Sequence, residues 1–507
     1  MIWTKLLLST ASAALLAAPF LEPRLFPLAW LAFVPLFWAL RRASTWRQAV
    51  LCGWAMGIAA HLIGFYWLVY TISAFGGFPY AVSVVVFVIY AALQAIQIAI
   101  FALCLRAAGP GPLCLFAPVF WVAGEFCFPL LFPWHVANSQ VSFLWFIQSA
   151  DLVGPYGASF IVVWFNAALL HGLTSRGQTP CARFLALGCA LLAVALSLVY
   201  GIQRLEIVGA EMASARKLSV TAVQGNVDID LKWDPVLAQR NLDQHRRLTE
   251  TADAAALVVW PESSIELMLP QDLPALPPSL MPSFKSEQTD FIFGAKSFRG
   301  TLGRPGAKAF NTAFFTDARG RILAHYHKQV LLAFGEYLPF AKILSLLPAI
   351  PFADGFTPGP GPIVFHLSRG VRVAPLICYE DLMPDLARRF VSETRANLLV
   401  NLTNDAWYGR SVGPWQHLWL AQSRAIETRR SLLRVTNTGV TSLVNARGEL
   451  AKTLPMFTPA VLQTEVEILN GETYYVRFGD WFAWAMTIAT LAIVIRIFSR
   501  KFPKNAE

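Results

Sequence analysis

Long apolar runs are the feature that most restricts how this chain of 507 residues can fold. Each run is long enough for an α-helix to cross a hydrocarbon layer about 30 Å thick. The runs lie near residues 6–20, 26–40, 49–71, 80–105, 113–131, 157–174, 184–202 and 481–498. The sequence therefore predicts a polytopic α-helical membrane bundle of about eight transmembrane helices, seven of them before a long polar segment.

Composition separates the chain into two environments. Hydrophobic residues make up 56% of the chain and charged residues only 14%, which is not typical of a soluble protein. Acidic side chains are almost absent from the apolar parts and are concentrated in the stretch between them. We therefore expect a membrane domain at 1–205, an extramembrane domain at 217–470, and a C-terminal transmembrane helix with a polar tail at 478–507.

The basic residues indicate how the chain is oriented. A net charge of +10 could suggest nucleic acid, but these residues cluster in short loops between apolar runs, so no nucleic-acid partner is expected. They follow the even-numbered runs, as Arg41, Arg42, Arg47, Arg106, Arg176, Arg183, Arg496, Arg500, Lys501 and Lys504. The positive-inside rule then places both termini in the cytoplasm and the 217–470 segment on the opposite face. If the first run were a cleaved signal peptide instead, the N-terminus would still lie inside.

Some ionisable and thiol side chains lie within the apolar runs. His61 and Glu125 are functional candidates by position, but hydrogen bonding between helices explains them equally well, so neither is given a role. Six of the seven cysteines fall in or beside apolar runs, which leaves Cys378 as the one thiol of the polar segment. A disulfide framework is therefore not expected.

Between residues 217 and 470 the pattern changes to short β-branched runs separated by helical stretches. The runs are 218–223, 256–259, 291–294, 371–377 and 398–402. This alternation predicts a layered α/β domain with buried strands. In such domains the reactive side chains gather where strands end and loops begin.

Three strand or loop endings carry reactive side chains. Glu262 follows an apolar run, where lost solvation would raise its pKa and suit it as a base; a turn or capping carboxylate is the plain alternative. Lys328 follows His327, and a surface lysine is the alternative there. Cys378 ends an apolar run and enters a turn rich in carboxylates, which is typical of nucleophiles in acyl transfer, although a buried structural cysteine would look similar.

In this order and with these flanks, Glu262, Lys328 and Cys378 resemble the Glu-Lys-Cys triad of the nitrilase or carbon-nitrogen hydrolase superfamily. The resemblance covers roughly residues 217–468 and extends to the segments Gln224–Asn226, Phe310–Thr312, Asn401–Asp405 and Arg434–Gly439. It implies a nitrilase-like α/β domain, an αββα sandwich, for this part of the chain.

With seven apolar runs before this domain and one after it, the whole chain is similar to the apolipoprotein N-acyltransferases of bacteria. The segments 334–339, Cys378–Glu380 and Gly413–His417 match that family rather than soluble nitrilases. The resemblance implies an inner-membrane enzyme with a periplasmic catalytic domain, a phospholipid acyl donor, usually phosphatidylethanolamine, and a diacylated apolipoprotein acceptor. We also expect a monomer without a cofactor, and without a metal because the eight His residues show no zinc-ligand spacing.

The resemblance and the residue chemistry together suggest a mechanism. Cys378 attacks the phospholipid ester, Glu262 acts as general base and then acid, and Lys328 supplies positive charge near the tetrahedral oxyanion. Glu336 orients Lys328 or assists the proton transfers. Two half-reactions through one thioester predict ping-pong kinetics.

Further residues match the family with less definite roles. Support of the nucleophile is expected from Tyr379 and Glu380, and substrate contacts from Trp233, Asn311 and Trp415. Water could be kept from the thioester by the segment 343–356 with Trp407, Tyr408 and Trp415, or these side chains could simply pack in the core.

Two other functions compete with acyl transfer to an amine. A membrane-tethered amidase or nitrilase acting on a small substrate would need one anchoring helix rather than eight runs. A transporter or lipid-binding scaffold with a degenerate enzyme domain would be expected to have lost Glu262, Lys328 or Cys378, and all three are present.

Overall fold

The computed structural model describes residues 2–109, 113–175, 179–229, 232, 235–301, 304, 306–337 and 355–501. The chain divides into two compact units. The first consists of Met1–Ile207 with Phe478–Glu507, and the second of Val208–Arg477. Trp233 and most of the segment 343–356, for which roles were expected, lie outside the described residues.

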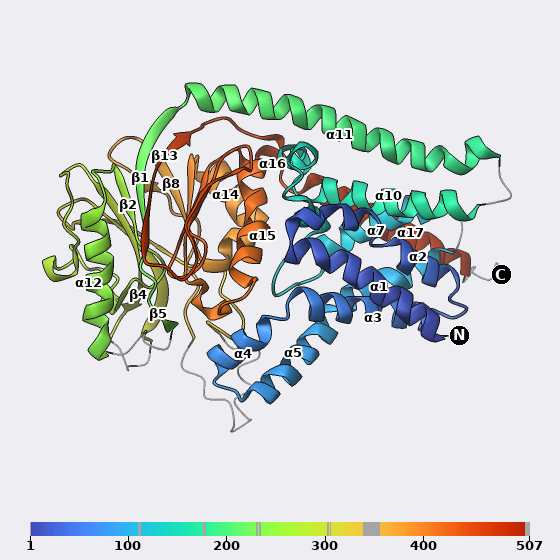
Figure 1. Ribbon diagram of the computed structural model, residues 1–507, viewed down its shortest axis with the longest axis horizontal. Helices are drawn as coiled ribbons and strands as arrows, with labels where there is room; N and C mark the ends of the chain where they lie inside the picture. The colour runs from blue at the N-terminus through green and yellow to red at the C-terminus, as the bar shows by residue number, and fades with distance from the viewer. Residues whose placement is uncertain are drawn as a thin grey trace, which may run out of the picture. The chain divides into compact units, whose positions relative to one another are not determined.

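The first unit is helical. Its elements are α1 (Ile2–Leu21), η1 (Pro23–Trp30), α2 (Val34–Arg41), α3 (Trp46–Gly64), α4 (Leu68–Gly76), α5 (Tyr80–Gln94), α6 (Ile96–Ala108), α7 (Leu113–Cys127), η2 (Val136–Gln140), α8 (Leu144–Ile147), α9 (Ala150–Val153), α10 (Tyr156–Thr174), α11 (Pro180–Ser214) and α17 (Trp481–Lys501) (Figure 1). Among the described residues, five spans are long and apolar enough to cross a membrane: α1, η1 with α2, α5 with α6, α10 and α11. A membrane bundle is thus supported, whereas the expected count of eight is not confirmed.

Two causes account for the difference in count. The run near 49–71 is broken into α3 and α4, which meet at 72°. Main-chain bonds of the i to i+3 type, from Leu68 to Phe65 and from Val69 to Tyr66, tighten the chain at the break. The apolar helical stretches Leu113–Cys127 and Trp481–Ile497, within the described residues, fall in the class of 10–17 residues, shorter than the about 20 residues of a typical span.

The polar side chains inside the first unit make hydrogen bonds. The Glu125 carboxylate accepts one from Trp121 Nε1 and one from the main-chain N–H of Val136, each at 2.7 Å. His61 Nδ1 lies 2.8 Å from the carbonyl oxygen of Gly57. For Glu125 this is the bonding between elements that the sequence left open, since Val136 belongs to η2 and Trp121 to α7.

The second unit is built on two β-sheets. Its elements are β1 (Arg216–Gln224), α12 (Pro235–Thr251), β2 (Leu257–Val259), β3 (Ile265–Pro270), η4 (Pro278–Leu280), β4 (Asp290–Arg299), β5 (Lys308–Thr316), β6 (Ile322–His327), β7 (Phe365–His366), β8 (Arg372–Ile377), η5 (Cys378–Leu382), α14 (Pro384–Thr394), β9 (Leu398–Thr403), η6 (Asp405–Tyr408), α15 (Gly413–Thr428), β10 (Leu432–Thr436), β11 (Ser442–Val444), β12 (Leu450–Thr453), β13 (Ala460–Ile468) and α16 (Tyr474–Phe478). In the described residues, one sheet has the order β13-β1-β2-β4-β5-β6 with β3 beside β4, and the other has the order β12-β11-β10-β9-β8-β7. The expected strands are confirmed as β1, β2, β4, β8 and β9.

The sheets pack face to face between helices. Strand β1 contacts β10 and β5 contacts β8, while α12 covers the first sheet and α14 and α15 cover the second (Figure 1). This is the αββα sandwich that the resemblance implied. In α14, the buried Leu386, Ala387, Phe390 and Val391 recur every three to four residues, which gives the helix one apolar face.

The strands at the centre of the second unit are buried. Strands β8, β9 and β10 run parallel, and all but the first residue of β8 are buried, as expected when both faces are covered. In the first sheet, Phe291, Phe293 and Phe314 are fully buried and their rings stack in sequence at 5.1 and 5.3 Å. Buried strands of both sheets therefore position the loops that carry the reactive side chains.

Candidate active site

The site is formed where strands of the two sheets end. Glu262 lies three residues after β2, and Lys328 directly follows β6 of the same sheet. Cys378 directly follows β8 of the other sheet. Residues separated by 66 and 50 positions in sequence are thus brought into electrostatic contact, since the charges of Glu262 and Lys328 both act on Cys378.

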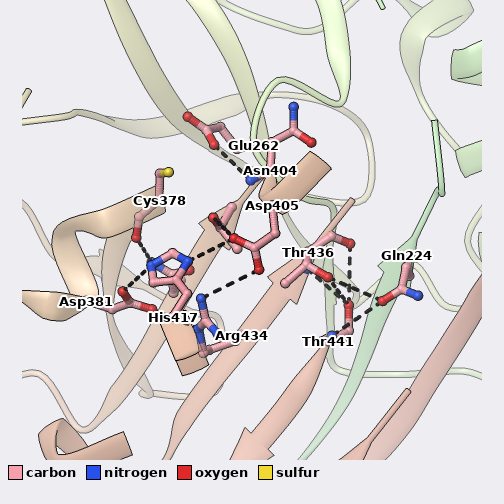
Figure 2. Close-up of polar contacts among 12 residues, drawn as sticks. Gln224, Glu262, Cys378, Asp381, Asn404, Asp405, His417, Arg434, Thr436 and Thr441 are labelled. Atoms are coloured by element: carbon pink, nitrogen blue, oxygen red, sulfur yellow. Dashed lines mark hydrogen bonds and ion pairs between the residues drawn. The ribbon is translucent and has the colours of Figure 1, made fainter. Parts of the chain in front are cut away.

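Glu262 is a buried carboxylate held on both oxygens. Asn311 Nδ2 donates to Oε1 at 2.7 Å. The main-chain N–H of Asn404 donates to Oε2 at 2.9 Å (Figure 2). Burial raises the pKa of Glu262 and the charge of Lys328 opposes the rise, but the net shift is upward. Such a carboxylate accepts a proton more readily than a solvated one.

Lys328 is a buried cation, not a surface one. Its side chain is 2% exposed, and Nζ lies 2.7 Å from Glu336 Oε2. Burial alone would lower the pKa of Lys328, but the charge of Glu336, with a further contribution from Glu262, raises it above its usual value. The ammonium group therefore stays charged and supplies a fixed positive charge beside the sulfur.

Cys378 begins η5 with φ at 55°, in the left-handed region that costs a non-glycine residue about 1–3 kcal/mol. Asn401 Nδ2 donates to its carbonyl oxygen at 2.7 Å, which helps to hold this conformation. The residue keeps part of its surface exposed, and Figure 2 shows its thiol on the side of Glu262. Burial and the Glu262 charge raise the pKa of the thiol well above its usual value, against the effect of Lys328.

Glu380 connects the turn that carries Cys378 to the loop that begins at Lys328. Its carboxylate accepts hydrogen bonds from the main-chain N–H groups of Gln329 at 2.7 Å, Val330 at 3.0 Å and Ile377 at 2.8 Å. These three residues flank Lys328 and Cys378 in sequence. Burial raises the pKa of Glu380 to about 7, although Lys328 and the three N–H donors lower it. Glu380 is thus placed to set the distance between the two strand ends.

Tyr379 and Asn311 complete the surroundings of the lysine. Lys328 Nζ lies 5.5 Å from the centre of the Tyr379 ring, within the range of a cation–π contact. Asn311 Nδ2 also donates to Glu336 Oε1 at 2.9 Å, so one amide bridges the carboxylates of Glu262 and Glu336. This gives Asn311 a positioning contact that the sequence did not predict.

Trp415 is not brought to the triad by any contact among the described residues. Its ring lies 5.9 Å from that of Trp419 on the same helix. A substrate contact for Trp415 stays a prediction. Tyr408 of the expected aromatic shield is buried, and its ring lies 5.7 Å from that of His417.

Sequence reasoning gave no role to several residues that hold the site. Asn404 supports Glu262 through its main-chain N–H, Asn401 supports Cys378, and Lys232 Nζ donates to the Glu262 carbonyl oxygen at 3.3 Å. Asn401 and Asn404 lie at the end of β9 and just after it, so the rule that chemistry gathers at strand ends could have indicated them.

The arrangement combines a thiol, a buried base and a fixed cation. These are the parts that nucleophilic acyl transfer needs: a nucleophile, a proton acceptor and a charge that stabilises the oxyanion. In the part of the chain that the structure describes, no group of three His, Cys, Asp or Glu side chains is placed to hold a metal ion.

Comparisons with known proteins identify the family of the chain. A family model for the apolipoprotein N-acyltransferase N-terminal domain matches residues 12–168, and one for carbon-nitrogen hydrolases matches residues 219–472. The apolipoprotein N-acyltransferase of Geobacter metallireducens is 34% identical over 98% of this chain and 95% of its own length. That of Pseudomonas paraeruginosa is 31% identical over 94% of this chain and 93% of its own length.

Among solved structures, Saccharomyces cerevisiae Nit3 of the nitrilase superfamily has a TM-score of 0.38 at 16% identity, covering 58% of this chain and 96% of its own. The assignment rests on the sequence relatives and the family models, not on this likeness. The chain therefore belongs to the apolipoprotein N-acyltransferases, the bacterial membrane enzymes that catalyse the last step of lipoprotein maturation.

Proposed function

We propose that this chain transfers an acyl group from a phospholipid to Cys378 and then to an amine, with Glu262 and Lys328 as its catalytic partners. In the first half-reaction Glu262 takes the thiol proton while Sγ bonds to the ester carbonyl carbon. Lys328 stabilises the oxyanion. The bond from carbon to the glycerol oxygen then breaks, and Glu262 returns the proton to that oxygen, which leaves a lysophospholipid and a thioester.

In the second half-reaction the uncharged α-amine of the acceptor attacks the thioester carbonyl carbon. Glu262 takes a proton from the nitrogen as the carbon–sulfur bond breaks, and the departing thiolate of Cys378 is reprotonated from Glu262. The products are an amide and the free enzyme. Because one covalent thioester separates the donor half-reaction from the acceptor half-reaction, we expect ping-pong kinetics.

The substrates follow from family membership. We expect phosphatidylethanolamine as the usual donor, and as acceptor an apolipoprotein whose N-terminal cysteine already carries diacylglycerol. The enzyme is expected to act as a monomer. In this scheme Glu336 and Asn311 hold Lys328 and Glu262 in place, as their contacts of 2.7 and 2.9 Å suggest.

One observation carries the proposal: a partly exposed thiol on a left-handed turn lies within the electrostatic reach of a buried carboxylate and a buried ammonium. The raised pKa of the thiol means that little thiolate exists at rest near neutral pH. The base must therefore remove the proton as the substrate is attacked, and Glu262 is the carboxylate whose raised pKa suits that task.

The purified enzyme should become acylated when it is incubated with phosphatidylethanolamine and no acceptor. Intact-mass analysis should show one added fatty-acyl group, and a diacylated lipopeptide added later should remove it. Phospholipase-released fatty acid serves as a control that cannot donate. An unmodified protein under conditions where the complete reaction proceeds would overturn the covalent route.

We propose further that residues 1–205 and 478–507 cross the bacterial inner membrane and that 217–470 form the catalytic domain in the periplasm, with both termini cytoplasmic. The basic residues that follow the even-numbered apolar runs support this orientation. Protease added to spheroplasts should cleave within 217–470 and spare a C-terminal tag. Cleavage of that tag in intact spheroplasts would reverse the orientation.

A further inference from the structure

Behind Cys378 lies a cluster of four buried charged side chains: Asp381 of η5, Asp405 of η6, His417 of α15 and Arg434 of β10 (Figure 2). His417 Nδ1 lies 2.8 Å from Asp405 Oδ1, and His417 Nε2 lies 3.0 Å from Asp381 Oδ1. Arg434 Nε donates to Asp381 Oδ2 at 2.8 Å. His417 belongs to the segment Gly413–His417, and it has no role in the proposed acyl-transfer steps.

Each ring nitrogen of His417 faces a carboxylate oxygen, an arrangement that favours an imidazolium with both nitrogens protonated. Burial would lower the pKa of His417, but Asp381 and Asp405 together raise it above its usual value. Arg434 and His417 in turn lower the pKa of Asp381 against the effect of its burial. The cluster thus pairs two basic side chains with two acidic ones, which is what buried charged groups need to be tolerated.

The two carboxylates belong to two different parts of the active site. Asp381 is three residues after Cys378 and lies in the same short helix, η5. Asp405 follows Asn404, whose main-chain N–H holds the Glu262 carboxylate at 2.9 Å. The imidazole of His417 therefore joins the turn of the nucleophile to the loop that supports the base.

The turn at Cys378 and the loop that contains Asp405 both need contacts with neighbouring groups to hold their conformation. Cys378 sits at a φ of 55°, a conformation that persists only when neighbouring groups enforce it. Gly439 packs so closely on Asp405 that a Cβ atom at that position would lie 2.6 Å from the Cβ of Asp405. Thr403 Oγ1 donates to Asp405 Oδ1 at 3.2 Å, so Asp405 is confined on several sides and can serve as a fixed point.

We propose that His417 is a positioning residue for the acyl-transfer reaction: by bonding Asp381 and Asp405 at once, it fixes Cys378 relative to Glu262. This inference rests on the proposed function and adds a residue to it. His417 does not touch the substrate or the reacting atoms. It acts through the two loops, and a displacement of about 1 Å between nucleophile and base can cost about 10²-fold in rate.

The test compares His417→Gln with His245→Gln in the full-length enzyme. His245 is an equally buried histidine, which bonds the Asn241 carbonyl oxygen and packs on Trp260, away from the nucleophile turn. We expect single-turnover acylation of Cys378 by phosphatidylethanolamine to slow about 10²-fold in His417→Gln. In His245→Gln it should stay close to the wild-type rate.

The rate constant is measured per reactive thiol, so a loss of folded protein alone does not change it. A purely structural role would lower the melting temperature of His417→Gln and leave this rate constant unchanged, which would overturn the proposal. If His417→Gln does not fold, Asp405→Asn keeps the shape and removes the negative charge that faces both His417 and Arg434, and slower acylation is again expected. Normal acylation in that variant contradicts the proposal. Absence of acylation in the wild type would instead refute the function on which it rests.

Discussion

Replacing Cys378 with alanine should abolish both the acyl-enzyme and the transfer of acyl groups to a lipopeptide. Alanine removes the sulfur atom and little volume, and the Asn401 bond to the carbonyl oxygen of residue 378 does not depend on the side chain. Loss of a covalent nucleophile lowers kcat by about 10⁶-fold in well-studied acyl-transfer enzymes. Activity should therefore fall below detection while the melting temperature stays near that of the wild type.

The control is Cys127→Ala, which removes a thiol from the helical unit. Cys127 Sγ lies 3.7 Å from Thr487 Oγ1 and takes no part in the site. This variant should be acylated like the wild type in intact-mass analysis. Residual transfer by Cys378→Ala above about 1 in 10³ of the wild-type rate would mean that another group carries the acyl chain, or that transfer is direct.

In the wild-type enzyme at rest, the Cys378 thiol is expected to be protonated. The rate at which this thiol is alkylated, measured in parallel with Cys378→Ala, examines that expectation. The pKa of Cys378 is raised by burial and by Glu262, while Lys328 lowers it only in part. The activation therefore differs from that of cysteine enzymes whose nucleophile is a thiolate at rest. We therefore expect Lys328 to contribute more to stabilising the oxyanion than to ionising the Cys378 thiol.

The ends of the strands were the most predictable part of the site. Cys378 and Glu262 each follow an apolar run that becomes buried strand, and such runs are visible in the sequence because both faces of the strands are covered. The positions of Cys378 and Glu262 at or just after strand ends were therefore predictable from the sequence. Their common location was implied by the resemblance alone, because no local pattern links positions 66 and 50 residues apart.

The supporting contacts could not be predicted in the same way. Glu380 accepts N–H groups from the ends of β6 and β8, which belong to different sheets, so its role depends on how the sheets face each other. The bridge from Asn311 to two carboxylates depends on β5 lying beside β6. Tertiary packing of this kind leaves no periodic trace in the sequence.

In the helical unit, the location of the apolar segments was predictable from the sequence, but the main-chain bend was not. Hydropathy located the apolar segments, because burial in lipid needs only composition and length. It did not indicate the bend between Gly64 and Leu68, since the residues on both sides are equally apolar. Main-chain geometry, not composition, decides where such a run breaks.

Family membership decides between the competing functions. The Geobacter relative aligns over 98% of this chain, including the helical part that a tethered amidase would not need. A degenerate scaffold would have no reason to keep Lys328 buried on Glu336 at 2.7 Å. An unneeded buried ion pair is costly to keep, because each charge loses its hydration.

Glu262→Gln should slow acylation of Cys378 by about 10²- to 10⁴-fold, the usual contribution of a general base. Glutamine preserves the size of the side chain and can still accept one of the bonds from Asn311 and Asn404. It cannot take the thiol proton. The other bond places two N–H groups against each other, so a small loss of stability is expected as well.

The pH dependence separates this role from a structural one. The wild-type rate should rise with pH as Glu262 loses its proton, and this limb lies above the ordinary range of a glutamate because burial raises the pKa against the effect of Lys328. In Glu262→Gln that limb should disappear. The rate should then increase about tenfold per pH unit with the thiolate fraction of Cys378, over the range below the pKa of the thiol.

Glu266→Gln is the matched control, because Glu266 is a nearby carboxylate on β3 whose Oε1 accepts a hydrogen bond from Asn241 Nδ2 at 3.0 Å. It should keep the wild-type pH profile. If Glu262→Gln also kept the profile and the rate, Glu262 would be a structural carboxylate and the proton would have to leave by another route. If Glu262→Gln were slow but its rate still rose with pH as in the wild type, Glu262 would position the site and a different group would titrate there. The thiolate-limited profile is expected only when the base itself is missing, because no other step makes the rate follow ionisation of the sulfur.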